Sequence, residues 1–328
     1  MLISSIIPSK ILRITSCMPL SYLNRLLTTG SDQTQQSQND SPVSVKKFSI
    51  DQIKFYQENG FFLVKGLIPT DNISSYVQRF NDIANGVVTV PGLVRQKDIS
   101  LKNEKPSERS VYKLQELFMD DKLFEYCQYS TILDYVQDII GPNIMAIHTM
   151  LINKPPDTGE LTSRHPLHQD LHYFPIRPAD KIVCAWTALD RSFRDNGCLV
   201  VLPKSHKGPL LEHDYPDWQA VNAMYHGVKM KPPEDRFYVE MDPGDTLFFH
   251  PLLIHGSGAN RTTGFRKAIS CHYASSDCHY INIKGTSQEN ISKEIIEVAK
   301  KKFGIDVDDV SVIWKYRAQL VRGDKINL

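Results

Sequence analysis

The stretch Leu167-His168-Gln169-Asp170-Leu171-His172-Tyr173 contains the only His-x-Asp pattern in the chain. Alternate residues of an extended strand point to the same side, so His168 and Asp170 can reach one metal ion while the residue between them faces away. His255 is a second candidate ligand, and Arg266 follows it by eleven positions. Two imidazoles and one carboxylate on one face of an octahedral metal leave open sites for substrates, as in non-haem iron oxygenases. The pattern therefore indicates a facial iron triad.

Each part of this pattern is weak when it stands alone. With 11 His and 37 acidic residues among 328, about one His-x-acid pair is expected by chance. The neighbouring histidines His165 and His172 lack a carboxylate two residues further on, which makes them poor candidate ligands. His250 would need the opposite strand parity from His255, so we expect it to bond locally. The surrounding segments therefore have to decide whether these histidines and carboxylates form a metal site or occur together by chance.

Short apolar runs rich in β-branched and aromatic residues alternate with turn residues, and no βα alternation is present. This arrangement predicts a mainly β domain with flanking helices, of the double-stranded β-helix class (jelly roll, cupin-like). In that fold the first ligand pair follows one strand, the distal His ends a late strand, and the Arg lies on the next. The runs that we expect to be strands are Ile144–Asn153, Ile182–Leu189, Cys198–Leu202, Thr246–His250 and Lys267–Ala274.

Helical patterns lie mainly outside the β region. Ser49 and Gln52 form a capping-box pattern that opens a helix ending near Gly60, and a strand is expected directly after it, at Phe61–Val64. Three other amphipathic stretches predict helices. The first begins at Thr70 and ends before Gly86, and the second runs from Thr131 to Ile140. The third ends at Gly304 and has Ile295, Val298, Ala299 and Phe303 at helical spacing.

Four segments and a C-terminal stretch resemble the phytanoyl-CoA dioxygenase family, and the resemblance extends from about Phe48 to the C-terminus. Because the motifs occur together, the resemblance is far more specific than a facial triad. The segments are His165-Pro166-Leu167-His168-Gln169-Asp170-Leu171-His172-Tyr173-Phe174-Pro175, Asn196-Gly197-Cys198-Leu199-Val200-Val201-Leu202-Pro203, Phe248-Phe249-His250-Pro251-Leu252-Leu253-Ile254-His255-Gly256-Ser257-Gly258, Gly264-Phe265-Arg266-Lys267-Ala268-Ile269-Ser270-Cys271-His272 and Lys284-Gly285-Thr286-Ser287-Gln288-Glu289-Asn290.

The resemblance implies roles for individual residues. His168, Asp170 and His255 would be the iron ligands, and Arg266 would bind the C5 carboxylate of 2-oxoglutarate through its planar guanidinium. Ser257 would add a hydroxyl from the same side as the distal ligand. The resemblance also places three residues in the lining of the co-substrate pocket: Lys113, Met150 and Trp186. Without it, Trp186 and Met150 would be read as core residues, Lys113 as a solvated charge and Arg266 as a surface pair.

The resemblance further implies 2-hydroxylation of a 3-methyl-branched fatty acyl-CoA such as phytanoyl-CoA, as in fatty acid α-oxidation. Iron(II), 2-oxoglutarate, dioxygen and ascorbate (vitamin C) would be required, and 2-oxoglutarate would leave as succinate and CO2. Two alternatives remain open: an oxygenase of this fold that acts on another small molecule, and a non-catalytic jelly-roll binding protein.

Composition agrees with one enzyme domain. The formal net charge is +1, so no field favours nucleic acid or an anionic membrane, and no run of eighteen apolar residues predicts a membrane span. The six cysteines (Cys17, Cys127, Cys184, Cys198, Cys271, Cys278) are scattered, which predicts reduced, mostly buried thiols rather than disulfides or a zinc site.

Residues 1–46 differ from the rest, and we expect them to form a targeting leader and a disordered linker before a catalytic domain at 47–328. Up to Ser31 the chain has basic residues but no Asp or Glu, and a Gln-rich polar stretch follows. The resemblance implies import into peroxisomes through an import receptor. Arg25-Leu26 followed by Asp32-Gln33 misses the usual signal by one position, and a mitochondrial presequence is the alternative.

Overall fold

The computed structural model describes residues 47–97, 103, 105, 107–159, 161–218, 222–231, 233–234 and 236–328. The predicted leader and linker, residues 1–46, lie outside the described residues, as does Cys17. Within the described residues no helix is long and apolar enough to cross a membrane.

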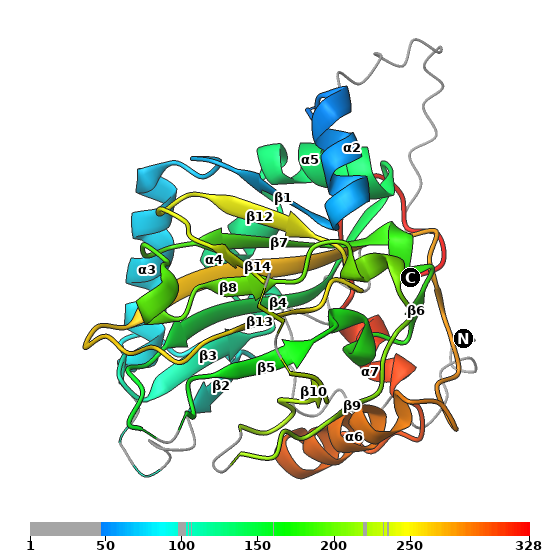
Figure 1. Cartoon of the computed structure of the whole chain (residues 1–328). Coiled ribbons are helices and arrows are strands. Elements are labelled where there is room, and N and C mark those ends of the chain that lie inside the picture. Colours follow the sequence, from blue (N-terminus) through cyan, green and yellow to red (C-terminus); the bar gives the residue numbers. More distant parts are fainter. Residues whose placement is uncertain are drawn as a thin grey trace, which may run out of the picture. The chain divides into compact units, whose positions relative to one another are not determined.

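The larger of two main sheets is antiparallel and has eight strands in the order β1-β12-β7-β14-β4-β3-β2, with β16 also paired to β4 (Figure 1). Its longest strands, β4 and β14, pair along their whole length and form the centre of the sheet. The strands are β1 (Phe61–Val64), β2 (Val94–Lys97), β3 (Val111–Gln115), β4 (Ile144–Lys154), β7 (Ile182–Ala188), β12 (Thr246–Phe249), β14 (Arg266–Ser275) and β16 (Gln319–Arg322).

A smaller sheet of four strands in the order β11-β8-β13-β5 lies over the larger one (Figure 1). Apolar side chains from both sheets, among them Trp186, Leu199, Val201 and Leu247, form one buried cluster between them. Two facing antiparallel sheets around such a core are the double-stranded β-helix that the sequence predicts. The strands are β5 (His165–His168), β8 (Leu199–Val201), β11 (Phe237–Val239) and β13 (His255–Ser257), and two-stranded ribbons join β9 (His213–Asp214) to β10 (Gly227–Val228) and β6 (Ile176–Arg177) to β15 (His279–Tyr280).

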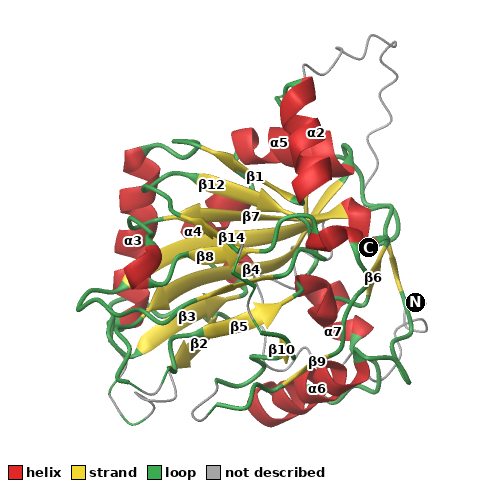
Figure 2. Cartoon of the chain, in the orientation of Figure 1, coloured by secondary structure: helices red, strands yellow, loops and turns green. Residues whose placement is uncertain are grey.

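Helices flank the sheets (Figure 2). The alternate face of β14, which carries Ile269, Cys271 and Tyr273, belongs to one buried cluster with apolar residues of four helices, α2 to α5. A separate cluster joins the C-terminal helices to the region after β5. The helices are α2 (Ile50–Asn59), α3 (Thr70–Ala84), α4 (Asp121–Cys127), α5 (Ser130–Ile140), α6 (Glu289–Phe303) and α7 (Ser311–Arg317), and short 3₁₀ turns include η4 (Asp170–Tyr173).

The five strands predicted from the sequence are confirmed to within one residue at each end. The helix after Ser49 is confirmed with its capping box, and Gly60 ends it with a φ of 83°, a left-handed conformation that glycine adopts without a steric penalty. The helices predicted from Thr70, from Thr131 and before Gly304 are also present. The five cysteines in the described part of the chain are free and buried, as predicted.

Candidate active site

Three side chains from the smaller sheet and the turn after it converge on one point. His168 ends β5, and His255 begins β13 directly opposite it in the register of the sheet. Asp170 is not a strand residue, as the alternation argument assumed, but opens the 3₁₀ turn η4. The carboxylate of Asp170 lies 3.2 Å from Nε2 of His168 and 3.6 Å from Nε2 of His255. All three residues are buried, and one ligand atom of each lies within 4.8 Å of the others.

The hydrogen bonds of the two rings fix which nitrogen of each faces the carboxylate. Nδ1 of His168 lies 2.9 Å from the Pro166 carbonyl, and Nδ1 of His255 lies 2.9 Å from the Leu253 carbonyl. A carbonyl can only accept, so in the neutral ring the proton is on Nδ1 and Nε2 presents a lone pair. Burial lowers the pKa of His255 to about 4, which keeps this ring neutral at pH 7. Two lone pairs and a carboxylate therefore face one another, a donor set that suits a metal cation.

Asp170 is oriented from its other side by His272. Nε2 of His272 lies 2.7 Å from Oδ2 of the carboxylate, the distance of a charge-assisted hydrogen bond. Burial raises the pKa of Asp170, but its interactions with His255 and His272 outweigh this effect and hold the pKa well below its usual value. Asp170 is therefore an ionised ligand with a hydrogen-bonded support of the kind that orients metal-binding carboxylates.

A second possible set of ligands, Asp170 with Cys184 and His272, overlaps the first. Burial raises the pKa of the Cys184 thiol well above its usual value, so the thiol keeps its proton and is a poor ligand. His272 already uses Nε2 for its hydrogen bond to Asp170. The predicted set His168, Asp170 and His255 is the one that fits a metal.

The larger sheet presents four more of the predicted site residues on its inner face. Directly opposite residues of antiparallel strands share a face, and Met150 pairs with Ser270, which pairs with Trp186. Ile152 and Lys154 follow Met150 on the same face of β4. Ile152 lies opposite Lys113 of β3, and Lys154 lies opposite Arg266 of β14. The four residues predicted from the sequence, Lys113, Met150, Trp186 and Arg266, thus face the same way from four neighbouring strands.

Arg266 is a buried cation with unfilled hydrogen-bonding capacity. The residue is 2% exposed, and Nη2 donates to the Gly197 carbonyl at 3.1 Å. Nε and Nη1 are buried and have no hydrogen-bond partner in the described part of the chain. The guanidinium carbon lies 5.2 Å from the centroid of the Trp186 ring, and burial lowers the pKa of Arg266 to about 10, still well above neutral pH. An unpaired buried guanidinium is costly unless an anion accepts its free N–H groups.

Ser257 lies two residues after His255 on β13, and a lysine that the sequence analysis did not single out contacts it. Nζ of Lys154 donates to the Ser257 hydroxyl and to the Gly258 carbonyl, both at 2.9 Å, and also to the Ser163 carbonyl. Because Ser257 accepts a hydrogen bond from an ammonium, its own hydrogen is free to be donated to an anionic ligand. The strand parity of β4 would have identified Lys154 as an inward-facing charge.

Lys113 is buried on β3 rather than solvated. Its Nζ lies 4.9 Å from the centroid of the Tyr225 ring, and the same ring lies 4.1 Å from that of His165, which in turn lies 4.2 Å from that of His168. Burial lowers the pKa of Lys113 to about 8, and the nearby charge of Asp170 partly opposes this shift. Lys113 and Tyr225 therefore lie on the side of the metal site that His165 borders.

The neighbouring histidines have other partners. His172 is bonded to His226, and His250 is bonded to Asp180 and to the Leu252 N–H, in agreement with the local role expected for it. Lys267, next to Arg266, points away from this face and lies 2.8 Å from Glu108.

A sequence model of the phytanoyl-CoA dioxygenase family matches residues 56–268, a range that contains all three triad residues and Arg266. The chain belongs to this family. It is 55% identical over 285 residues to the peroxisomal phytanoyl-CoA dioxygenase of Rattus norvegicus, with 85% of this chain and 84% of the relative covered. The Homo sapiens protein of the same name is 54% identical over 285 residues, which cover 85% of this chain and 84% of that protein. A probable phytanoyl-CoA dioxygenase of Caenorhabditis elegans is 52% identical over 296 residues, with 85% and 95% covered.

Solved structures of more distant proteins share the fold of this family member. The α-ketoglutarate-dependent epimerase SnoN from nogalamycin biosynthesis aligns with a TM-score of 0.54 and 20% identity, over 71% of this chain and 85% of that one. EctD from S. alaskensis with bound Fe aligns with a TM-score of 0.54 and 15% identity, over 75% of this chain and 82% of that chain. These similarities agree with the predicted double-stranded β-helix.

Proposed function

We propose that this protein is an iron(II)/2-oxoglutarate dioxygenase that hydroxylates C2 of a 3-methyl-branched fatty acyl-CoA such as phytanoyl-CoA. The observation that carries the proposal is the presence of two groups of ligand-binding atoms in one fold. One is the set of metal-binding lone pairs of His168, Asp170 and His255, and the other is the unpaired guanidinium of Arg266. Both are what this chemistry requires, and the relatives that bear the name are more than half identical to this chain.

The triad would hold iron through Nε2 of His168 and His255 and through the Asp170 carboxylate. The Pro166 and Leu253 carbonyls keep each imidazole in the tautomer that binds a metal, and His272 holds the carboxylate. These contacts exist before the ion binds, so little reorganisation is needed on binding. When bound, iron(II) would bring together 2-oxoglutarate and dioxygen, the oxidant, so that hydroxylation of a C–H bond is coupled to release of succinate and CO2.

Arg266 would bind the C5 carboxylate of 2-oxoglutarate with its free Nε and Nη1 groups. The Ser257 hydroxyl, oriented by Lys154, would donate to the same carboxylate. Trp186 lies against the guanidinium and would keep water away from the ion pair, which strengthens it. Lys113 and Met150 would line the same pocket from β3 and β4.

The walls of the site suit an oxidant that has to be kept from water. The Phe249 ring lies 4.6 Å from that of His255, and Trp186 and Phe249 belong to the apolar cluster between the sheets. An apolar enclosure of this kind limits side reactions of the reactive centre. Dioxygen would be the second co-substrate, and ascorbate would act as the reductant that keeps the iron in its iron(II) state.

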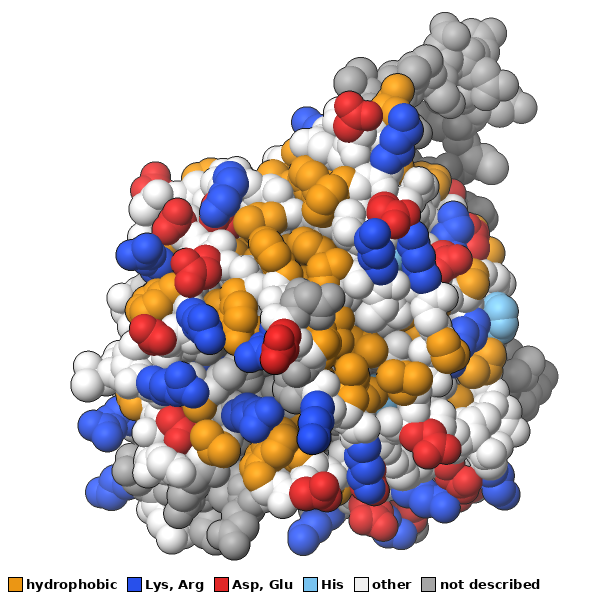
Figure 3. Space-filling model, viewed as in Figure 1, with side chains coloured by type: hydrophobic (Ala, Val, Ile, Leu, Met, Phe, Trp, Pro, Cys, Tyr) orange, Lys and Arg blue, Asp and Glu red, His pale blue; other side chains and the backbone are white. Residues whose placement is uncertain are grey.

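The surface around the smaller sheet suits an amphipathic substrate. Apolar side chains gather across the middle of this face, with Lys and Arg as well as Asp and Glu side chains around them (Figure 3). Such a surface would accept an apolar acyl chain together with the anionic phosphates of coenzyme A.

A substrate panel tests the proposal against an oxygenase that acts on another molecule and against a non-catalytic binding protein. Phytanoyl-CoA, straight-chain acyl-CoAs, the free acids and small polar compounds would be incubated with the protein, iron(II), 2-oxoglutarate, ascorbate and dioxygen. We expect 2-hydroxyphytanoyl-CoA and succinate in equal amounts, measured by mass spectrometry. Hydroxylation of a small polar compound in preference to any acyl-CoA would overturn the substrate assignment, and absence of turnover with every compound would favour the binding protein.

We further propose that residues 1–46 direct the protein to peroxisomes through an import receptor, with mitochondria as the alternative. The acid-free basic start of the segment and the word peroxisomal in the relatives' names support this. Imaging of residues 1–46 fused to a fluorescent protein tests it. Co-localisation with a peroxisomal marker is expected, whereas co-localisation with a mitochondrial marker would contradict it.

A further inference from the structure

The sequence segment that ends in Gln288-Glu289-Asn290 reaches from the start of α6 to the turn that carries Asp170. Gln288 is 2% exposed, and its amide nitrogen donates to the carbonyls of Leu171, His172 and Phe174 at 2.9, 3.0 and 3.1 Å. Its amide oxygen accepts from Arg177 at 2.6 Å. One buried side chain thus binds three buried backbone carbonyls in and just after η4, the turn that begins with the metal ligand Asp170.

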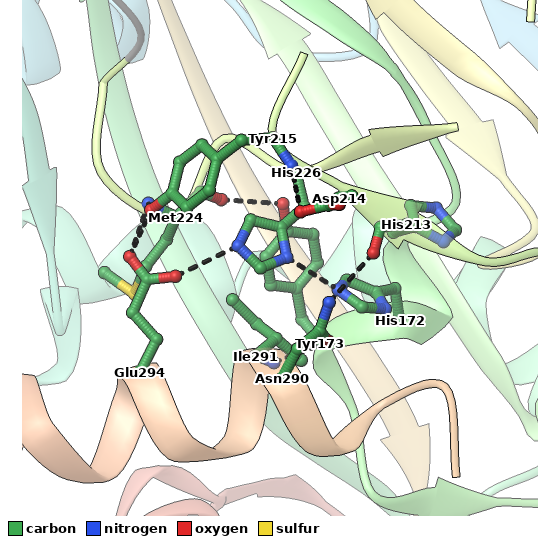
Figure 4. Close-up of polar contacts among 10 residues, drawn as sticks. All are labelled: His172, Tyr173, His213, Asp214, Tyr215, Met224, His226, Asn290, Ile291 and Glu294. Atoms are coloured by element: carbon green, nitrogen blue, oxygen red, sulfur yellow. Dashed lines mark hydrogen bonds and ion pairs between the residues drawn. The ribbon is translucent and has the colours of Figure 1, made fainter. Parts of the chain in front are cut away.

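A second connection runs from the middle of α6 to the same turn (Figure 4). Nε2 of His226 lies 3.0 Å from Oε2 of Glu294, and Nδ1 of His226 lies 3.2 Å from Nε2 of His172. The other carboxylate oxygen, Oε1 of Glu294, accepts from the Met224 N–H at 3.1 Å and from the Tyr215 hydroxyl. Glu294 therefore ties α6 to η4 through His226.

The direction of these hydrogen bonds is fixed by the carboxylate. Partial burial raises the pKa of Glu294, but hydrogen bonds from His226 and Tyr215 outweigh it and hold the pKa below its usual value. An ionised carboxylate only accepts, so His226 donates from Nε2; the neutral His226 ring then accepts at Nδ1, and His172 donates from Nε2. His172 is left with a bare Nδ1, which has no partner in the described part of the chain. Any change that reverses the relay would place a buried N–H at this position without an acceptor.

The turn is also held at its other end. The Gln169 N–H donates to Nε2 of His213 at 2.9 Å, and the His213 ring stacks on that of His172 at 4.3 Å. Asn290, the third residue of the segment, donates to the His213 carbonyl at 2.9 Å. Both flanks of Asp170 are thereby connected to α6, which lies beyond the residues 56–268 that the family model matches.

We propose that Gln288 and Glu294 are positioning residues of the metal site: they hold the η4 turn so that the Asp170 carboxylate stays aligned with His168 and His255. The inference rests on the proposed metal triad and adds the requirement that the C-terminal helix sets its geometry. Gln288 acts through the backbone carbonyls in and after the turn, and Glu294 acts through His226 and the side chain of His172. Supports of this kind typically change metal affinity by ten-fold or more when they are removed.

The test is anaerobic titration of the purified full-length protein with Fe²⁺, together with absorption spectra of the Co²⁺-loaded protein. Gln288→Ala removes the donor to three carbonyls, and Glu294→Gln replaces an oxygen with an amide nitrogen that cannot accept from every present donor. We expect each to weaken Fe²⁺ binding by roughly ten-fold and to alter the Co²⁺ spectrum. Because Glu294→Gln is nearly isosteric, it keeps the test decisive if Gln288→Ala fails to fold.

Ile295→Ala is the matched control, since Ile295 is a buried residue of the same helix in the C-terminal apolar cluster. It should lower the melting temperature at least as much as Glu294→Gln while Fe²⁺ affinity and the Co²⁺ spectrum stay unchanged. Wild-type affinity in both test variants, or an equal loss of affinity in Ile295→Ala, would overturn the positioning role. A wild-type protein that binds no Fe²⁺ would instead contradict the proposed function itself.

Discussion

Two buried polar clusters lie on either side of the η4 turn and differ in how their hydrogen-bonding groups are filled. The intersheet cluster (His168, Asp170, His255, Ser257, Arg266) combines the metal-binding atoms of the triad with buried N–H groups of Arg266 that have no partner in the described part of the chain. The helix cluster (His172, His213, His226, Glu294) joins its members by hydrogen bonds and a ring stack that end on a carboxylate.

The difference shows how histidines close together in sequence come to have different roles. His168 and His172 are four positions apart and both buried, yet Nε2 of His168 faces a ligand carboxylate while Nε2 of His172 donates to His226. A buried polar group without a partner costs stability, so the unpartnered N–H groups of Arg266 near a set of metal-binding atoms point to ligands, whereas the helix cluster leaves only Nδ1 of His172 without a partner in the described part of the chain. The intersheet cluster is built to be completed by an ion and an anion, whereas the helix cluster is built to hold the turn.

The largest expected effect separates the two clusters. Alanine at His168, Asp170 or His255 should abolish iron-dependent turnover without unfolding the protein, because the β core forms independently of the ion. His165→Ala and His172→Ala should still load iron at saturating metal. Activity, iron content and a circular dichroism spectrum of each variant check this. Full iron occupancy in His168→Ala would contradict the assignment.

A smaller effect is expected at Arg266, the anionic-ligand end of the intersheet cluster. Arg266→Ala removes a charge-assisted contact worth about 1.5–3 kcal/mol, which corresponds to a roughly 10- to 100-fold rise in the KM for 2-oxoglutarate. Iron should still bind. Lys267→Ala is the control, because Lys267 pairs with Glu108 on the other face of the sheet. An unchanged KM in Arg266→Ala would show that another group binds the co-substrate.

The sequence was sufficient to predict the main strands and the intersheet cluster, because both depend on local pattern and on family motifs. The alternation of Arg266, Ala268 and Ser270 with Lys267, Ile269 and Cys271 already separates the inner from the outer face of β14. Applied to β4, the same parity would have pointed to Lys154. The motifs placed His168 and Asp170 together although Asp170 lies in a 3₁₀ turn rather than in a strand.

The helix cluster could not be predicted in the same way. Gln288 contacts residues more than a hundred positions earlier, and no periodicity within α6 indicates which element its first residues meet. From its local sequence alone, Lys113 would be predicted to be an exposed charge, because a single lysine ahead of an amphipathic segment is usually solvated. Its burial depends on the pairing of β3 with β4 across 35 to 39 residues of sequence, which no local pattern specifies.

A still smaller effect tests whether Ser257 belongs to the intersheet cluster. Ser257→Ala removes one hydrogen bond of about 1 kcal/mol, so we expect the KM for 2-oxoglutarate to rise about five-fold, with iron affinity unchanged. Ser257→Thr keeps the hydroxyl and should restore most of the affinity. Steady-state kinetics with varied 2-oxoglutarate measure both. If Ser257→Ala has the wild-type KM, the hydroxyl does not contact the co-substrate.

The smallest effect is expected on removal of residues 1–46, because the residues named in both clusters lie in the described part of the chain. A shortened protein that begins at Lys47 should be fully active, because Lys47 and Phe48 retain their N–H contacts to Asp138 and the first helix is capped by Ser49. Its kcat/KM and melting temperature, compared with those of the full chain, check this. A loss of activity would show that residues 1–46 belong to the catalytic fold.

The location of the metal tests the account most directly. Crystals grown anaerobically with Fe²⁺ and measured at the iron absorption edge would give an anomalous difference peak at each bound ion. The account predicts one strong peak within coordination distance of Nε2 of His168, Nε2 of His255 and the Asp170 carboxylate, and none in the helix cluster. A peak among His172, His213 and His226, or no peak at the triad in protein that turns over, would contradict it.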